Sequence, residues 1–123
     1  MGELIYKELS YEIMGCAFNV FKELGFGYRE KYYQRALAEE LKKAKIKFEK
    51  ELAVKLWYDG KIIGKYKLDF LVENKIILEA KIAKDFYTKD IKQILSYLKA
   101  KNLRLGILII VTKDGMKFKR VVN

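Results

Sequence analysis

The 123-residue chain contains no histidine and no proline, and it has a single cysteine. Without histidine there is no histidine-based catalytic triad and no histidine-ligated zinc, which leaves carboxylate chemistry. Cys16 alone cannot form an intrachain disulfide, which fits a reducing compartment, and we expect a cytoplasmic protein. Because Cys16 lies in an apolar helical stretch, we predict that it is a small core residue and not a nucleophile.

Long apolar runs are also absent. The longest, Ile107 to Val111, is far too short to cross a bilayer. Glu3, Lys7 and Glu8 lie among the first apolar residues, which is not typical of a secretory signal. We therefore expect no membrane association. With 51% apolar residues, the chain is long enough to bury a core, and we predict one domain over residues 1–123.

Acidic residues are much scarcer than basic ones: 16 Asp and Glu stand against 26 Lys and Arg, for a formal net charge of +10. A polyanion is the obvious partner, because lysines that neutralise phosphates drive salt-dependent binding of nucleic acids. Only 4 of the basic residues are arginines, which argues against readout of base edges, where Arg–guanine contacts are commonest. The alternative is a lysine-rich surface that only provides solubility.

The chain is organised around residues 67–81, which read as two β-strands joined by a tight turn at residues 73–75. Asp69, Glu79 and Lys81 interrupt these apolar strands. Charge at such positions is costly unless it is paired or bound to a metal ion. Glu79 and Lys81 are two residues apart, so they point to the same side of their strand.

A three-residue loop would set Val72 across from Ile76, and therefore Asp69 across from Glu79. Directly opposed residues have Cβ atoms about 5 Å apart, and two carboxylates at that separation repel each other unless a cation lies between them. The arrangement favours a hard divalent metal ion with Lys81 beside it. The alternative is a structural ion-pair cluster, in which the lysine neutralises both acids.

Hydrophobic periodicity and turn signals predict the other elements. We expect helices over residues 3–24, 30–45 and 88–101, and strands over residues 48–58, 61–72, 75–83, 105–112 and 116–122. Asp59-Gly60 predicts a tight hairpin turn, and Gly64 a bend or bulge. The first three strands should form an antiparallel meander, the helical crossover should make the third and fourth strands parallel, and the last strand should be an edge. The predicted fold class is α/β (α+β), in the order α-α-β-β-β-α-β-β.

An Asp on one strand followed by Glu-x-Lys on the next resembles the PD-(D/E)XK nuclease superfamily. Asp69, Glu79 and Lys81 stand at the motif positions, and Leu68 stands where the superfamily's name has proline. The resemblance implies a restriction-endonuclease-like core, with a mixed central sheet of about five strands flanked by helices.

A second motif strengthens this resemblance. Gly27, Glu30 and Tyr33 have the spacing GxxExxY, and Gln93 and Tyr97 follow on a later helix. Over nearly its whole length the chain resembles the GxxExxY-type proteins of that superfamily, a largely uncharacterised bacterial and archaeal group.

The resemblance also implies roles for individual residues. Asp69 and Glu79 would bind Mg²⁺ or Mn²⁺, with Glu30 as a further carboxylate at the metal site; alternatively, Glu30 only interacts with the dipole of its helix. Gln93 would orient a water or a phosphate near Lys81; alternatively, it is a polar residue on a helix surface. Lys81 would either stabilise charge on the phosphate or help to deprotonate the attacking water.

The function that these roles imply is metal-dependent hydrolysis of a phosphodiester, by a nuclease and specifically a DNA endonuclease that contacts the phosphate backbone. Small junction-resolving enzymes of the superfamily are dimers, so a homodimer and a four-way junction are the candidate assembly and substrate. The alternative, from a different class, is a non-catalytic module that binds nucleic acid or a protein partner and has kept the nuclease fold.

Overall fold

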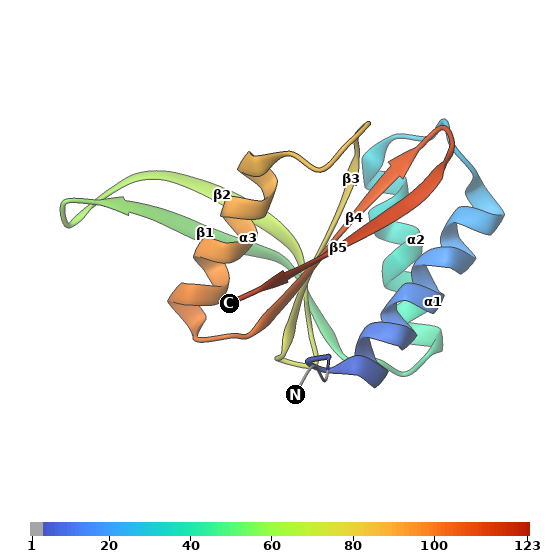
Figure 1. Ribbon diagram of the computed structural model, residues 1–123, viewed down its shortest axis with the longest axis horizontal. Coiled ribbons are helices and arrows are strands. Elements are labelled where there is room, and N and C mark those ends of the chain that lie inside the picture. Colours follow the sequence, from blue (N-terminus) through green and yellow to red (C-terminus); the bar gives the residue numbers. More distant parts are fainter. Residues whose placement is uncertain (1–3) are drawn as a thin grey trace.

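The computed structural model describes residues 4–123 and confirms the predicted order of elements (Figure 1). The helices are α1 (Lys7–Leu24), α2 (Glu30–Lys43) and α3 (Thr88–Lys101). The strands are β1 (Phe48–Tyr58), β2 (Lys61–Val72), β3 (Ile76–Ile82), β4 (Leu105–Thr112) and β5 (Gly115–Val122). In this part of the chain, no helix has the length and apolarity that crossing a membrane requires.

The five strands form one mixed sheet in the order β1-β2-β3-β4-β5. β1, β2 and β3 pair antiparallel, as the meander predicts. β3 and β4 are parallel and are connected through α3, so the predicted crossover is confirmed. β5 pairs antiparallel with β4 and closes the sheet as an edge strand. All residues of β4 are buried, because helices cover both faces of the sheet there.

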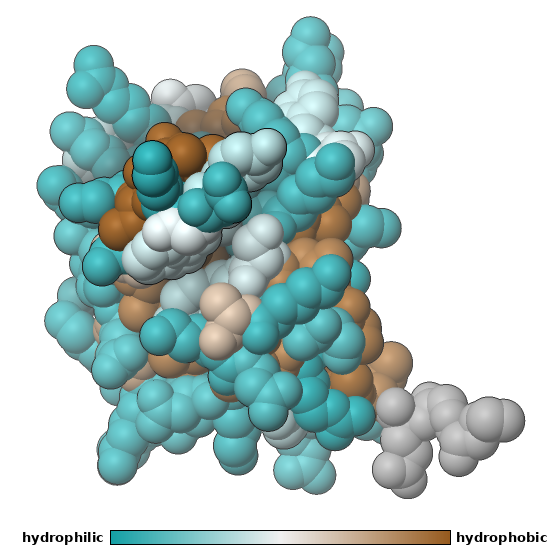
Figure 2. All heavy atoms as spheres, turned by 90° about the vertical axis from the view of Figure 1, so that its left-hand side faces the viewer, coloured by the Kyte–Doolittle hydropathy of each residue, from teal (hydrophilic) through white to brown (hydrophobic). Residues whose placement is uncertain are grey.

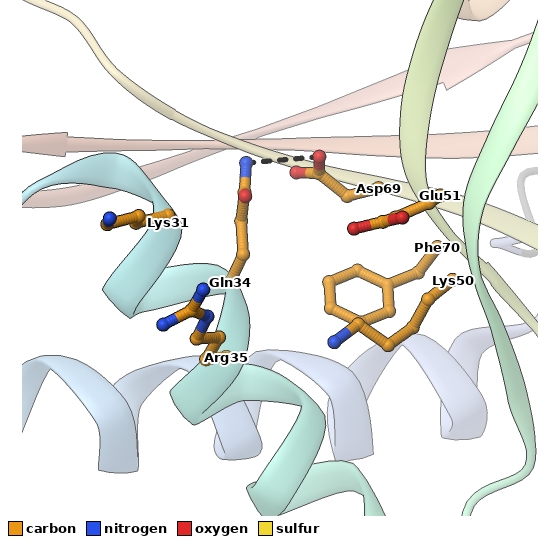
Figure 3. A pocket seen from close by; sticks show the side chains of 7 residues that line it. All are labelled: Lys31, Gln34, Arg35, Lys50, Glu51, Asp69 and Phe70. Carbon is orange, nitrogen blue, oxygen red and sulfur yellow. Dashed lines mark hydrogen bonds between the residues drawn. The ribbon is translucent and has the colours of Figure 1, made fainter.

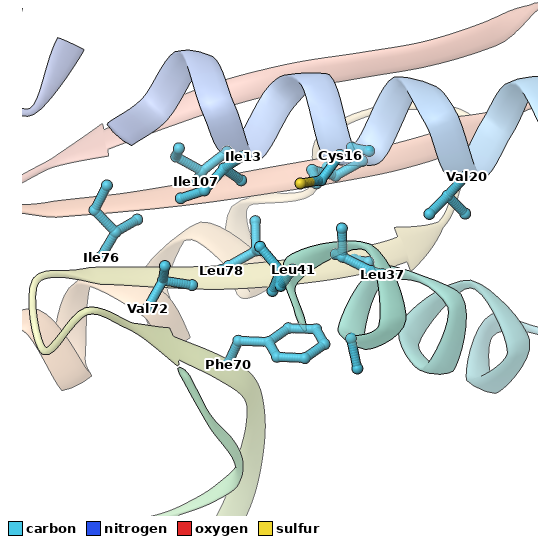
Figure 4. Packing of buried hydrophobic residues seen from close by; sticks show 14 of the residues in the cluster. Ile13, Cys16, Val20, Leu37, Leu41, Phe70, Val72, Ile76, Leu78 and Ile107 are labelled. Atoms are coloured by element: carbon cyan, nitrogen blue, oxygen red, sulfur yellow. The ribbon is translucent and has the colours of Figure 1, made fainter. Parts of the chain in front are cut away.

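α1 and α2 cover one face of the sheet, and their apolar faces pack on alternate residues of β3 and β4 (Figure 4). Phe70, Leu78 and Ile107 of this cluster are fully buried. Cys16 also belongs to it, and burial, followed by the nearby charge of Glu40, raises the pKa of its thiol. Cys16 is therefore a core residue, as predicted.

α3 covers the other face, over a second cluster that includes Leu68, Ile77, Ile94 and Leu108. Gly106 of β4 lies directly beneath this helix. A Cβ atom at Gly106 would collide with Cγ2 of Ile94, which branches at Cβ and cannot swing aside. The close approach of α3 to the sheet therefore depends on the missing side chain.

The start of α1 differs from the prediction. The predicted start, residue 3, lies outside the described residues, and the helix begins at Lys7 because Tyr6 has a left-handed backbone conformation, with φ of 51°. The carbonyl of Ile5 accepts a hydrogen bond of 2.7 Å from the Arg120 guanidinium. An interaction with the last strand therefore replaces the first helical turn that the apolar periodicity predicts.

The end of α2 also differs from the prediction, by two residues. Lys45 adopts φ of 59°, and the Ile46 amide donates to the Leu41 carbonyl, which closes the helix at Lys43. β3 is one residue shorter at each end than predicted, and β5 one residue longer at its start.

β1 and β2 extend beyond the rest of the sheet as a two-stranded ribbon, and we call its outer part, residues 53–67, the arm (Figure 1). Asp59 and Gly60 turn the chain at its tip with φ of 50° and 74°, as the predicted tight hairpin requires. Leu56 pairs with Gly64, but Trp57 pairs with Ile62, so the predicted irregularity is confirmed as a bulge next to Gly64.

The close contact at Gly106 generates a stability prediction. Gly106→Ala should lower the free energy of unfolding by about 1–3 kcal/mol, because α3 must move away from β4. Ile94→Ala removes the atom that would collide. The double variant should therefore lose less unfolding free energy than the sum of the losses in the two single variants, as measured by urea denaturation. Strictly additive losses would show that the helix does not rest on Gly106.

Candidate active site

The site lies where β2 and β3 separate. Regular pairing of the two strands runs from Val72–Ile76 to Phe70–Leu78 and ends there. Just beyond it, the amide of Asp69 donates to Oε1 of Glu79 at 2.9 Å, and the amide of Ala80 donates to Oδ2 of Asp69 at 2.8 Å. Each carboxylate therefore satisfies a backbone group that the sheet leaves unpaired, and the two acids meet at the fork between the strands.

A backbone irregularity turns the side chain of Asp69 toward α2. Successive strand residues normally face opposite sides of a sheet. Here Asp69 and Phe70 line the same pocket, as do Lys50 and Glu51 on the neighbouring strand. Glu51, at the register position opposite Asp69, has a left-handed φ of 54°. On both strands, the alternation of side chains between the two faces of the sheet is therefore interrupted at this point.

The pocket beside Asp69 is lined by α2, β1 and β2 (Figure 3). Its residues are Lys31, Gln34, Arg35, Lys50, Glu51, Asp69 and Phe70. Gln34 Nε2 donates a hydrogen bond of 3.1 Å to Oδ1 of Asp69 and so fixes the orientation of the carboxylate. Three of the lining residues are cations, which gives the pocket a basic rim around one acid.

Sequence reasoning did not select Gln34. It follows Glu30 by four residues, so the two side chains lie on the same face of α2. That spacing was the available signal, but many polar residues on a helix share such a spacing with an acid. Only the packing of α2 against β2 distinguishes Gln34 from the others.

Burial makes the two acids difficult to ionise together. Glu79 is only 2% exposed, and burial, followed by the charge of Asp69, raises its pKa to about 9. Burial also raises the pKa of Asp69, although the hydrogen bond from the Ala80 amide opposes that shift. The positive charge of Lys81 lowers the pKa of both acids. The fork therefore favours additional positive charge, either protons or a cation.

Lys81 lies two residues after Glu79 on β3 and is partly buried. It acts on both acids through its charge, and within residues 4–123 it forms no direct ion pair with either of them. The structure therefore brings together Asp69, Glu79 and Lys81, the three residues of the predicted motif.

Glu30 lies at the edge of the same region. Its Oε1 accepts a hydrogen bond of 3.0 Å from the Ile82 amide, and its charge raises the pKa of Asp69. Glu30 is also the first residue of α2, where a negative charge interacts favourably with the helix dipole. Within the described part of the chain, no group of three ligand-type side chains converges on one point, so a ligand role for Glu30 stays a prediction.

The structure places Gln93 on α3, across the sheet from α2. Its carbonyl accepts a hydrogen bond of 3.2 Å from the Tyr66 hydroxyl. Over residues 4–123 its side chain forms no hydrogen bond with the residues at the fork, and its predicted action on a water or phosphate stays a prediction.

The residues with GxxExxY spacing order the loop before α2. The Tyr33 hydroxyl donates to the carbonyl of Gly25 and accepts from the Tyr28 amide at 3.4 Å. Gly27 adopts φ of 123°, which a side chain would strain. This loop fixes the start of α2, and therefore the position of Glu30.

A family model described as the PD-(D/E)XK nuclease superfamily matches residues 7–121. The chain belongs to that superfamily. No curated protein matches the chain.

The fold is also similar to that of a solved structure. The chain resembles the crystal structure titled "Crystal structure of SSO0001", with a TM-score of 0.59 and 19% sequence identity. The match covers 96% of this chain but 57% of that one, so the chain spans little more than half the length of the SSO0001 chain. At this identity the likeness concerns the fold alone.

The pKa of Glu79 predicts how stability depends on pH in the absence of metal. Folding raises this pKa from 4.5 to about 9, so the protonated carboxyl stabilises the fold. The contribution is complete below about pH 4.5 and is lost as the pH rises toward 9. In EDTA, the free energy of unfolding should therefore fall by roughly 1–3 kcal/mol between about pH 5 and pH 8.

Glu79→Gln is the matched control, because a neutral amide can still accept the hydrogen bond from the Asp69 amide. Its stability should change less over the same range, as measured by urea denaturation at each pH. Parallel pH profiles for the two proteins would show that Glu79 titrates as an ordinary carboxyl.

Proposed function

We propose that this protein is a metal-dependent phosphodiester hydrolase, specifically a DNA endonuclease, that acts at the fork between β2 and β3. One observation carries the proposal: the buried Glu79 and the partly buried Asp69, from neighbouring strands, meet beside a lysine, and the surroundings raise the pKa of both acids. Membership of the PD-(D/E)XK nuclease superfamily supports a nuclease-like function.

The residues at the fork suit a hard divalent cation. Asp69 and Glu79 would hold Mg²⁺ or Mn²⁺ through carboxylate oxygens, the ligands that these ions prefer. Each acid has one oxygen engaged by a backbone amide, which orients the carboxylate before any ion arrives. When bound, such an ion activates water and neutralises charge on phosphate oxygens. Glu30 is the candidate for a further ligand.

The protein's own residues would position and stabilise the reacting phosphate. Gln34 orients Asp69, while Lys31, Arg35 and Lys50 on the pocket rim would bind phosphates of the backbone. Lys81 would either stabilise the charge that develops on the phosphate oxygens or accept a proton from the attacking water.

The other candidate is a non-catalytic module that binds nucleic acid and retains the nuclease fold. The hydrogen bonds that the two carboxylates accept favour it, because Glu79 binds the Asp69 amide and Asp69 binds the Ala80 amide. Both acids therefore stabilise the fork whether or not a reaction occurs. The two candidates differ in the need for Lys81, whose ammonium is required by a reaction but by none of the backbone contacts at the fork.

Metal binding can be tested by thermal denaturation. Mn²⁺ should raise the melting temperature of the wild-type protein, and this rise should largely disappear in Asp69→Asn. A ligand present at 100 times its dissociation constant stabilises a protein by about 2.7 kcal/mol, which is several degrees for a domain of this size. An equal rise in both proteins would remove Asp69 from the metal site.

Cleavage of plasmid and branched DNA in Mg²⁺ or Mn²⁺ tests the reaction and the role of Lys81. Lys81→Ala should reduce the rate by roughly 100-fold or more, while Lys22→Ala on the exposed face of α1 serves as the control. Lys81→Arg separates the two roles, because guanidinium keeps the charge but cannot act as a base. Substantial activity of Lys81→Arg indicates charge stabilisation, and its loss indicates proton transfer. Cleavage that persists in Lys81→Ala contradicts the site assignment.

A further inference from the structure

The arm is not explained by the fold or by the candidate active site. It carries several large apolar side chains that remain exposed, including Trp57 at 59%, Tyr58 at 71% and Ile63 at 61%. Figure 2, which views the molecule from the end at which the arm projects, shows brown (hydrophobic) and pale spheres at the front of a mostly hydrophilic surface. A two-stranded ribbon with exposed apolar side chains is at best marginally stable by itself, so the arm is expected to have a partner.

The two faces of the arm differ in character. Val54 and Tyr66 are directly opposite each other and pack in the cluster beneath α3. Their neighbours along the strands must therefore point to the other side of the ribbon. Lys55 is directly opposite Lys65 on that side, and Lys67 lies next to this pair. We call these three residues the lysine face.

Like charges at directly opposed positions destabilise a pair of strands. All three residues of the lysine face are exposed, and no acid within residues 4–123 forms an ion pair with any of them. Asp59 at the tip is the one acid among residues 53–67, against four lysines. Within residues 4–123, no ion pair compensates the repulsion between Lys55 and Lys65. A bound polyanion would relieve this repulsion and would be attracted by both lysines.

The lysine face lies on the same side of the sheet as the basic pocket. Asp69 turns toward α2, and Lys67 precedes it by two residues on the same side of β2. The cations of the pocket rim, Lys31, Arg35 and Lys50, therefore continue along β2 into the lysine face. Two molecules of this chain, each with a formal charge of +10, would repel each other across such a surface.

We infer that the lysine face binds the phosphate backbone of duplex DNA on one side of the candidate cleavage site, an inference that rests on the proposed function. Lys65 lies four residues from Asp69, or about 13 Å along an extended strand, which corresponds to roughly four base pairs. Trp57 and Ile62 are opposite each other nearer the tip of the arm. They form an apolar surface at a distance from Asp69 that corresponds to roughly seven base pairs. A two-stranded ribbon has the width that the major groove admits.

Equilibrium binding to a duplex of about 20 base pairs, without divalent metal, tests this inference independently of cleavage. The double variant Lys55→Gln/Lys65→Gln should bind about tenfold or more weakly at about 0.1 M salt. The slope of log K against log salt should become less steep by about 1.8, because two phosphate contacts are lost. Its melting temperature should equal or exceed that of the wild type, because the variant removes a repulsion.

The matched control is Lys7→Gln/Lys22→Gln, which removes the same charge from the exposed surface of α1, away from the projecting arm. Its salt slope should stay close to that of the wild type. Equal losses for the two double variants would overturn the inference, since binding would then depend on net charge alone. A wild-type dimer in DNA-free buffer that Trp57→Ala dissociates would also overturn it, by assigning the arm to contact between copies.

Cleavage assays distinguish failure of this inference from failure of the proposed function. Specific loss of duplex binding in the arm variant, with no cleavage under any metal condition, would retain the inference and reject the nuclease. Cleavage by the wild type, with unchanged duplex binding by the arm variant, would support the nuclease and reject the inference about the lysine face.

Discussion

Two hydrogen bonds across the fork, from the Asp69 amide to the Glu79 carboxylate and from the Ala80 amide to the Asp69 carboxylate, are the interactions on which the rest of this structure depends. β2 and β3 pair over only three positions before they diverge, and a fork in a sheet exposes backbone amides that need acceptors. Each acid accepts from an amide on the opposite strand, so the fork can open within a buried region. The same contacts hold two carboxylates together in surroundings that disfavour two negative charges.

Several parts of the architecture support this fork. α2 supplies Gln34 to one acid and Glu30 to the backbone of β3, and the loop closed by Tyr33 fixes where α2 starts. α3 approaches the opposite face closely because β4 has glycine at position 106. α2 therefore does more than cover the sheet, because its side chain Gln34 orients the carboxylate of Asp69.

Most of the fold could be predicted because local patterns and tertiary packing agree. Asp59-Gly60 requires a tight turn, and the apolar residues of β4 require burial. The loop at residues 73–75 sets Val72 opposite Ile76, as predicted, and so brings Asp69 close to Glu79. Two features could not be predicted, because they arise from tertiary contacts. Tyr6 leaves the helical conformation where Arg120 binds the preceding carbonyl, and Glu51 adopts a positive φ beside Asp69.

Because each acid accepts a hydrogen bond from a backbone amide, finding both acids in a sequence does not by itself indicate catalysis. A carboxylate at either position stabilises the fork between β2 and β3. Selection for folding alone would therefore retain it after catalytic activity had been lost. The side chain of Lys81 has no such structural role within residues 4–123, since it forms no hydrogen bond or ion pair there. In related chains, the presence of the lysine, and not that of the acids, should therefore distinguish a catalytically active protein from an inactive homologue.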